Sequence, residues 1–234
     1  DHFTFEELVS KETDASDHSR PYPFFLAYPV QETSTVNKTV EELQERLGEA
    51  SEWQVEWKWD GIRAQIIKRK GEIFIWTRGE DLATEKFPEL HDFIRELPDG
   101  TVLDGEILAF REGHPLPFTI LQTRIGRKNL SKKMLAENPV AFIAYDILET
   151  AGADIRERPQ EERRKILEKT QRESAYGEIF RISELIDADS WEKLAVARER
   201  SRDLMAEGLM LKWKSAPYQV GRRRGDWWKW KVDP

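Results

Sequence analysis

"EWKWDGIR", residues 56–63, places a lysine between two tryptophans in a stretch that otherwise has the character of a buried strand. Successive side chains of a strand point to opposite faces of its sheet. This alternation puts the tryptophans on one face, where they can pack into a core. It puts Glu56, Lys58 and Asp60 on the other face, where the acid and the lysine would share a pocket. We therefore predict that Lys58 faces a cleft.

The same alternation of polar and apolar side chains recurs in "VLDGEIL" (102–108), "EGLMLKWK" (207–214) and "WWKWK" (227–231). If these strands line one cleft, several lysines and carboxylates meet there. Carboxylates and phosphate oxygens are hard ligands for Mg²⁺, so this combination suits a nucleotide phosphate with a divalent metal. The residues predicted to share a face are Asp104 with Glu106, Met210 with Lys212 and Lys214, and Lys229 with Lys231.

Each of these residues also has a simpler interpretation. A lysine on the polar face of a strand is usually solvated, and acid–lysine neighbours are usually weak surface pairs. Tryptophans at alternate positions are usually core residues, and three consecutive arginines at 222–224 are typical of a solvated loop. Lys-x-Asp-Gly alone recurs by chance. Taken singly, the patterns leave both interpretations open.

The other segments predict a mixture of helices and strands. "NKTVEELQERLG" (37–48) predicts a helix, with Asn37 or Thr39 as its cap and Gly48 as its end. Alternation on both sides of Lys70-Gly71 predicts a hairpin. We expect an α/β or α+β domain built on largely antiparallel sheets. Further helices are predicted at 81–97, 159–173 and 189–207, and further strands at 101–110 and 139–149.

The composition excludes several classes of site. There are no cysteines, so disulfides, thiolate chemistry and Cys-ligated zinc are excluded. The 4 histidines are scattered along the chain, which argues against a His-based metal site. No apolar run approaches membrane-spanning length, and the N-terminus has no basic segment followed by an apolar one. We expect a soluble, intracellular monomer with no membrane partner.

Charge is distributed unevenly along the chain. The 37 basic and 44 acidic residues give a net charge of −7. Residues 1–57 hold 13 acidic and 4 basic residues, whereas residues 207–234 hold 3 acidic and 7 basic residues. This asymmetry indicates that one face meets an anion while the opposite end stays acidic. It predicts a polyanionic partner without identifying it.

Six segments then occur in a telling order. They are "KWDGIR" (58–63), "TRGED" (77–81), "LDGEI" (103–107), "FIAYDIL" (142–148), "EGLMLK" (207–212) and "WWKWK" (227–231). In this order they resemble motifs I, Ia, III, IIIa, IV and V of the covalent nucleotidyltransferases, and specifically the adenylation domain of ATP-dependent DNA ligases. The resemblance implies an ATP-grasp-like nucleotidyltransferase fold. In that fold, largely antiparallel sheets flanked by helices have a nucleotide cleft between them.

The resemblance implies that Lys58 is the nucleophile. It would attack the α-phosphate of ATP, form a covalent lysine–AMP phosphoramidate and release pyrophosphate. The AMP would pass to a 5′-phosphate at a DNA nick, and the phosphodiester bond would then be sealed. Glu56 would recognise the adenine, and Tyr145 would stack on it. This sequence departs from the family motifs at two positions: it has Tyr145 in place of Phe, and Gly79 where many relatives carry Asn. Neither difference removes a charged side chain.

The resemblance also implies how the rest of the nucleotide is held. Arg63 and Arg78 would contact the ribose and the phosphates. Glu106 would bind the ribose or assist the metal, which would be Mg²⁺ or Mn²⁺. Glu207 would serve the metal too. The α-phosphate would be held by Lys212, Lys229 and Lys231.

By the same resemblance, residues 1–22 are expected to be the linker remnant of an upstream domain, and residues 23–234 the adenylation domain. DNA ligases follow this domain with an OB-fold, and many carry an N-terminal DNA-binding domain. We expect both to be linked to this chain in the full-length protein and absent from the sequence given. The chain alone is therefore expected to be poorly active.

Two basic segments are the candidates for DNA contact: "RIGRKNLSKK" (124–133) and "GRRRGDWWKWK" (221–231). Basic residues in glycine-containing loops suit contacts with the phosphate backbone, which carry no sequence information. The expected partner is nicked double-stranded DNA, in repair, replication or recombination. The candidate contacts are Arg124, Arg127, Lys128, Arg222, Arg223 and Arg224.

Other functions use a similar chain. RNA ligases and mRNA-capping guanylyltransferases also have Lys-x-Asp-Gly, although the contexts "EWKWDGIR" and "DWWKWK" favour a DNA ligase. An NAD-dependent ligase would need an additional N-terminal domain. A non-catalytic nucleic-acid-binding module with the same scaffold is a further alternative. Retention of the chemistry-bearing lysines and glutamates argues against such a module.

Overall fold

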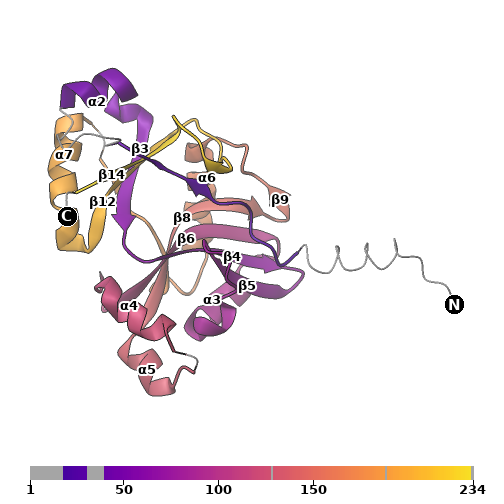
Figure 1. Cartoon of the computed structure of the whole chain (residues 1–234). Coiled ribbons are helices and arrows are strands. Elements are labelled where there is room, and N and C mark those ends of the chain that lie inside the picture. The colour runs from indigo at the N-terminus through magenta and orange to yellow at the C-terminus, as the bar shows by residue number, and fades with distance from the viewer. Residues whose placement is uncertain (1–17, 31–39, 128, 188, 233–234) are drawn as a thin grey trace.

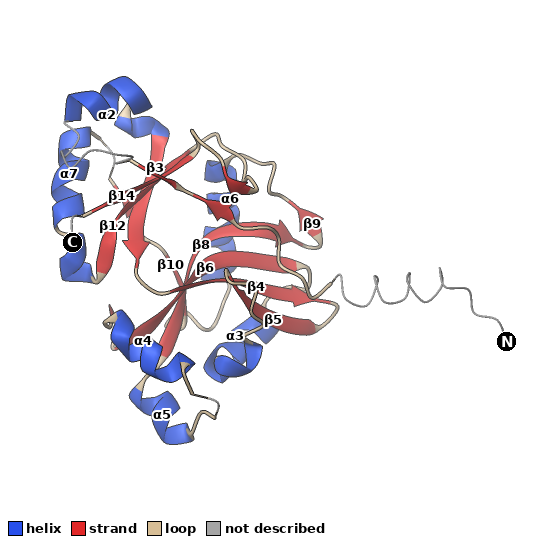
Figure 2. Cartoon of the chain, viewed as in Figure 1, coloured by secondary structure: helices blue, strands red, loops and turns tan. Residues whose placement is uncertain are grey.

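Figure 1 shows the computed structural model of the chain, which describes residues 18–30, 40–127, 129–187 and 189–232. Two β-sheets face each other, and helices cover their outer sides (Figures 1 and 2). Several predicted features lie outside the described residues. These are the helix caps Asn37 and Thr39, Lys128, and residues 1–17 of the expected linker.

The larger sheet contains seven strands within the described residues, with the main order β10-β8-β6-β4-β5. All its pairs are antiparallel except β10 with β8. The predicted hairpin at Lys70-Gly71 is confirmed: both residues have positive φ, 52° and 74°, as a two-residue hairpin turn requires. The strands are β4 (Ile62–Arg69), β5 (Glu72–Thr77), β6 (Thr101–Arg111), β7 (His114–Pro115), β8 (Val140–Thr150), β9 (Ala153–Asp154) and β10 (Phe180–Ile182).

The smaller sheet has the order β11-β3-β12-β14-β2. Its central strands are antiparallel, and only β2 joins β14 in parallel. The expectation of largely antiparallel sheets is therefore confirmed. The strands are β2 (Tyr28–Pro29), β3 (Trp53–Trp59), β11 (Leu185–Ile186), β12 (Ala206–Trp213) and β14 (Trp227–Lys231), and β1 (Phe25–Leu26) separately pairs with β13 (Gly221–Arg222).

Each sheet packs its apolar face against helices. Helices α2 (Val40–Leu47) and α7 (Trp191–Glu199) cover the smaller sheet on the left of Figure 1, where their leucines meet the tryptophans of β3 and β14. The larger sheet packs against α3 (His91–Glu96), α4 (Phe118–Ile125) and α6 (Gln160–Arg172). Helix α5 (Lys132–Glu137) follows α4. Within the described ranges, each helix is too short or too polar to cross a membrane.

Two predicted helices are shorter than their sequence patterns indicated. Residues 81–97 form the 3₁₀ turns η2 (Thr84–Lys86) and η3 (Pro88–Leu90) before α3 begins. Pro88 lacks the N–H that a continuous helix would need. The helix predicted at 189–207 ends at Glu199, and η4 (Ser201–Leu204) follows it. Residues from Ala206 onward instead pair with β3, so sheet pairing overrides the helical pattern.

A buried ion pair attaches helix α6 to β8. Arg163 donates from Nε and Nη2 to the two carboxylate oxygens of Asp146, at 2.8 and 2.9 Å. Both side chains are 0% exposed. Arg163 also donates to the Ala216 carbonyl at 3.2 Å, which connects α6 to the loop that follows β12. Arg163 therefore connects β8 of the larger sheet with the segment that follows β12 of the smaller sheet.

We expect Asp146→Ala to lower the free energy of unfolding by about 3–5 kcal/mol, because it leaves the Arg163 guanidinium buried without its counterion. Asp154→Ala is the matched control, since Asp154 pairs with Arg156 at a partly exposed position. That change should cost about 0–1 kcal/mol. Urea unfolding followed by tryptophan fluorescence measures both, and equal losses in the two variants would contradict the prediction.

Candidate active site

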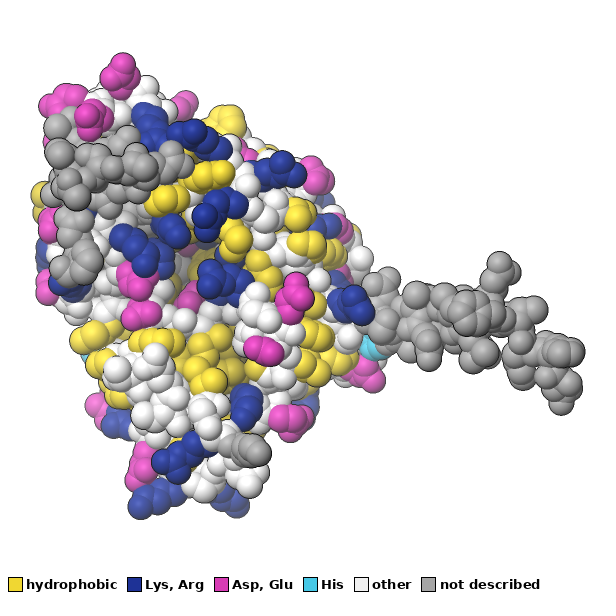
Figure 3. All heavy atoms as spheres, viewed as in Figure 1, with side chains coloured by type: hydrophobic (Ala, Val, Ile, Leu, Met, Phe, Trp, Pro, Cys, Tyr) yellow, Lys and Arg dark blue, Asp and Glu magenta, His cyan; other side chains and the backbone are white. Residues whose placement is uncertain are grey.

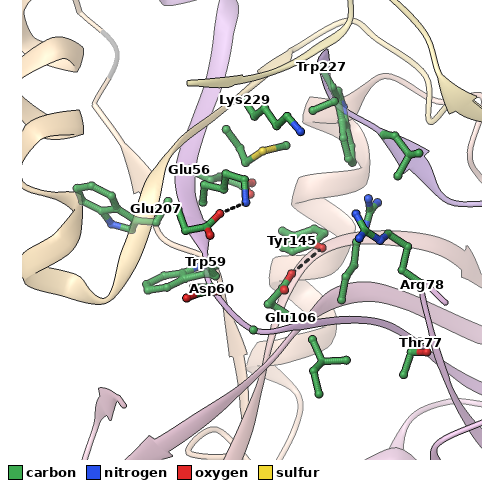
Figure 4. Close-up of a pocket in the computed structure, with 18 of the residues that line it drawn as sticks. Glu56, Trp59, Asp60, Thr77, Arg78, Glu106, Tyr145, Glu207, Trp227 and Lys229 are labelled. Atoms are coloured by element: carbon green, nitrogen blue, oxygen red, sulfur yellow. Dashed lines mark hydrogen bonds and ion pairs between the residues drawn. The ribbon is translucent and has the colours of Figure 1, made fainter. Parts of the chain in front are cut away.

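A pocket of about 650 Å³ lies between the two sheets. Figure 3 shows Lys and Arg side chains gathered around a hollow on this face, and Figure 4 shows the lining residues from within. Strands from both sheets contribute side chains to it. Every residue predicted to contact the nucleotide or the metal lines this pocket: Glu56, Lys58, Arg63, Arg78, Glu106, Tyr145, Glu207, Lys212, Lys229 and Lys231.

The basic end of the pocket is built on β3, β12 and β14. Lys58 donates a hydrogen bond to Glu207 Oε2, and Lys231 Nζ lies 3.1 Å from the same oxygen. Lys229 extends into the pocket above them (Figure 4). The register between β3 and β12 shifts between Ala206 and Leu209. Glu207 lies within this irregularity, which places its carboxylate beside Lys58.

Gly208 makes this close strand packing feasible. Its φ is 139°, and a Cβ there would lie 2.2 Å from the Trp230 carbonyl oxygen. Only glycine accommodates both the backbone conformation and the approach of β14. The Glu-Gly pair at the start of β12 therefore combines a charged side chain with the backbone that positions it.

Burial and neighbouring charges shift the pKa values of Glu207 and Lys229 at the basic end of the pocket. Burial acts to raise the pKa of Glu207, but hydrogen bonds from Lys58 and Lys231 outweigh it, so the pKa is lowered. Burial lowers the pKa of Lys229, and the neighbouring charges of Lys58 and Arg222 lower it further. Three lysines, Lys58, Lys229 and Lys231, thus lie at this end with the ionised Glu207 carboxylate, and Asp60 lines the pocket beside them. An anion such as a phosphate would relieve their repulsion.

The opposite end of the pocket is buried and aromatic. The Lys212 ammonium lies over both the Tyr145 and the Trp227 ring, with its Nζ 4.4 and 4.6 Å from the two ring centroids. Lys212 Nζ donates to Glu56 Oε2 at 2.9 Å, and both side chains are 1% exposed. Lys212 therefore differs from Lys229 and Lys231, with which it was grouped, because its charge is already paired in the interior.

Arg63 and Arg78 occupy different environments. The Arg63 guanidinium donates to both carboxylate oxygens of Asp104, at 3.2 and 2.7 Å, and to the Phe25 carbonyl at 2.6 Å. Tyr218 donates to Asp104 at 2.6 Å. Most donors of Arg63 are therefore occupied by protein groups. Arg78 is exposed at the edge of the pocket and keeps its side chain available to a ligand.

Glu106 lies below Tyr145, whose hydroxyl donates to Glu106 Oε2 at 3.3 Å (Figure 4). Burial raises the pKa of Glu106 to about 7, against the opposing charges of Arg63 and Lys58. Among the described residues, no group of three or more acidic or histidine side chains could hold a metal ion by itself. Mg²⁺ usually takes one or two carboxylates plus phosphate oxygens and water. Glu207 and Glu106 fit that donor set.

The residues predicted to contact DNA fall into two groups. Arg124 is 1% exposed and is held by the Glu89 carboxylate and by the Lys86 and Asn138 carbonyls. Contrary to the prediction of a DNA contact, this side chain lies in the interior. The exposed ones are Arg127, Arg222, Arg223 and Arg224, and Lys128 lies outside the described residues.

Some lining residues were not predicted to bind the nucleotide. Met210 and Trp227 line the buried end, and strand alternation could have identified both, since they share faces with Lys212 and Lys229. Tyr218 contacts Arg63 and Asp104 from the loop after β12. No sequence pattern connects that loop residue to the pocket.

Comparison with known proteins now identifies the family. Residues 26–231 match the family model described as ATP dependent DNA ligase domain. This chain belongs to that family. The ligase domain is 37% identical to a probable DNA ligase of Anaeromyxobacter sp. over 82% of this chain and 36% of that protein. It is 34% identical to a probable DNA ligase of Koribacter versatilis over 90% of this chain and 38% of that protein. It thus spans little more than a third of these relatives.

Solved structures agree with this assignment. The ligase domain from M. tuberculosis LigD is 28% identical, with a TM-score of 0.66 over 89% of this chain and 60% of that chain. A mycobacterial DNA ligase D complexed with ATP and MES is 27% identical, with a TM-score of 0.65 over the same shares. The predicted nucleotidyltransferase fold is confirmed.

We expect Glu106→Gln to change how the stability of the ligase domain depends on pH. The pKa of Glu106 rises from 4.5 to about 7 on folding, so the folded state binds more protons between these values. The stability contributed by this group therefore falls as pH rises through that range and is constant above it. Glutamine removes this loss.

Urea unfolding at about pH 4, 6 and 8 tests this expectation. The free energy of unfolding of Glu106→Gln, relative to that of the parent, should increase as the pH rises from about 4 to about 8. The exposed Glu162→Gln is the control and should track the parent throughout. Parallel pH curves for the parent and Glu106→Gln would exclude a raised pKa at this position.

Proposed function

We propose that this ligase domain transfers AMP from ATP to its own Lys58 and then to the 5′-phosphate at a nick in double-stranded DNA. The observation that carries the proposal is the arrangement at the basic end of the pocket. There Lys58 is hydrogen-bonded to Glu207, and Lys229 and Lys231 face the same space. A lysine nucleophile among other cations suits attack on a phosphate.

The pocket has two ends that match the two ends of a nucleotide. The buried aromatic end, with Tyr145 and Trp227, suits a base. The basic end suits phosphates, and exposed Arg78 and Arg222 extend it toward solvent. With the base beside Tyr145, the α-phosphate would lie toward Lys58. The β- and γ-phosphates would then point to the open side of the pocket.

The first step requires the neutral amine of Lys58. Its nitrogen forms a bond to the α-phosphorus while the bond from that phosphorus to the bridging oxygen breaks, and pyrophosphate leaves. The proton that the nitrogen loses passes to solvent at the open side of the pocket, and Glu207, which accepts the hydrogen bond from Lys58, would orient the amine. Lys229 and Lys231 would stabilise the negative charge that develops on the phosphate oxygens.

Glu207 and Glu106 would hold Mg²⁺ or Mn²⁺ together with phosphate oxygens of ATP. When bound, the ion supplies Lewis-acid stabilisation of the phosphate charge. In the later steps AMP passes from Lys58 to the 5′-phosphate. The 3′-hydroxyl then attacks that phosphate, AMP leaves, and the strand is sealed. We further propose a linked OB-fold and DNA-binding domain in the full-length intracellular protein, since the curated relatives are much longer.

We expect Lys58→Ala to abolish AMP transfer while the fold stays intact, because Lys58 supplies the attacking nitrogen. The measurement is the intact mass after incubation with ATP and Mg²⁺, and again after pyrophosphate. The parent should gain one AMP, mapped to Lys58, and lose it with pyrophosphate. Lys214→Ala is the control: Lys214 directly follows β12, lies outside the pocket and donates to the Ser51 carbonyl, so this change should leave labelling unchanged.

A labelled Lys58→Ala protein would contradict the proposed nucleophile. If the parent chain is not labelled, the measurement is repeated with the following domain attached, and a second failure would favour a non-catalytic module. Labelling by GTP in preference to ATP would indicate a capping guanylyltransferase. Transfer of AMP to nicked RNA but not to nicked DNA would indicate an RNA ligase.

For DNA binding, we expect the triple change of Arg222, Arg223 and Arg224 to Gln to reduce the salt dependence of affinity for nicked DNA. Each lost phosphate contact removes about 0.9 from the slope of log K against log salt, so the slope should fall by about 2–3. Fluorescence anisotropy between about 50 and 200 mM salt measures it. Lys165, Lys169 and Arg172, exposed on α6, provide a control triple of equal charge. Equal losses from both triples would place the interface elsewhere.

A further inference from the structure

The Glu56 carboxylate accepts hydrogen bonds from three side chains, each on a different helix or strand. Gln54 Nε2 donates to Oε1 at 2.7 Å, and Arg164 Nη1 lies 3.5 Å from the same oxygen. Lys212 Nζ donates to Oε2 at 2.9 Å. The donors belong to β3, α6 and β12 respectively. Glu56 therefore has little freedom to rotate or move.

Arg164 reaches this carboxylate from outside the pocket. It does not line the nucleotide pocket, but it lines a separate groove between α6 and the edge of the smaller sheet. Its guanidinium is anchored by the Glu168 carboxylate at 2.7 Å and by the Ser183 carbonyl at 2.8 Å. The anchored guanidinium extends the Glu56–Lys212 pair into a chain of alternating charge that is buried except at Glu168.

We infer that Arg164 and Gln54 are positioning residues that set base specificity, because they hold Glu56 as a fixed hydrogen-bond acceptor at the base end of the pocket. This inference rests on the proposed function, which places the base beside Tyr145. A carboxylate oxygen can accept a second hydrogen bond in addition to those shown. Glu56 lines the pocket, so the acceptor remaining there faces the bound base.

An acceptor in this position selects a particular purine edge. The six-amino group of adenine is a donor and would satisfy the carboxylate. A purine with hydrogen at that position leaves the buried acceptor without a partner, and a six-carbonyl places two acceptors against each other. Sites built to hydrogen-bond a substrate group discriminate strongly against analogues that lack it. Discrimination between adenine and the other purines then depends on a fixed position of Glu56, which Gln54 and Arg164 maintain through their contacts with its carboxylate.

The experiment compares the binding of ATP with that of purine riboside triphosphate, which lacks only the six-amino group. Binding is measured by calorimetry on a Lys58→Ala background, so that no covalent product forms. This background should prefer ATP by roughly 10- to 100-fold, as expected for a hydrogen bond to a charged group. Adding Arg164→Met or Gln54→Met should reduce the preference at least fivefold. Arg164→Lys should restore part of it.

Arg172→Met is the matched control, because Arg172 is an exposed arginine on the same helix. It should leave the preference unchanged. An undiminished preference in folded Arg164→Met and Gln54→Met proteins would overturn the inference while leaving the proposed function intact. Should Arg164→Met fail to fold, Gln54→Met and Arg164→Lys decide the matter. Absence of ATP binding to the background protein would overturn the proposed function itself.

Discussion

The pairing of β12 between β3 and β14 is the constraint on which the site depends. With β12 in this register, Lys58, Glu207 and Lys231 meet at one point, although they lie far apart in the sequence. The same pairing sends Leu209 and Leu211 into the core beneath α2 and α7. The geometry of the pocket and the packing of the core therefore depend on opposite faces of the same strands. A slip of one residue would exchange them.

This period of two explains why so much of the site could be predicted from the sequence. Alternation in two short segments, residues 56–63 and 227–231, was enough to place Glu56, Lys58, Lys229 and Lys231 on the pocket side, and the order of motifs supplied the rest. The hairpin at residues 70–71 was predictable for a similar local reason, since a glycine marks a turn that needs positive φ. Predictions held where the decisive interaction lay within a strand or between adjacent strands.

Predictions that depended on distant partners were less complete. Arg124 belongs to a basic segment and resembles a DNA contact, but the Glu89 carboxylate and two carbonyls draw it into the interior. A helix was predicted to continue to residue 207, but the residues from Ala206 onward form β12, which pairs with β3. Tyr218 reaches Arg63 and Asp104 from a loop with no periodicity. In each case the partner is separated in sequence, so no local pattern carries the information.

The lysines of the pocket differ in what their charge can do. Lys229 and Lys231 line the basic end of the pocket, where Lys231 shares the partly exposed Glu207 carboxylate with Lys58. The charge of Lys212 is instead matched by Glu56 in the interior. A buried ion pair of this kind contributes little net stability compared with apolar residues of similar size, because desolvation offsets the attraction. Stability alone therefore does not account for the pair. The proposed role of Glu56 as a fixed acceptor for the base does account for it, since a buried carboxylate needs a cation beside it.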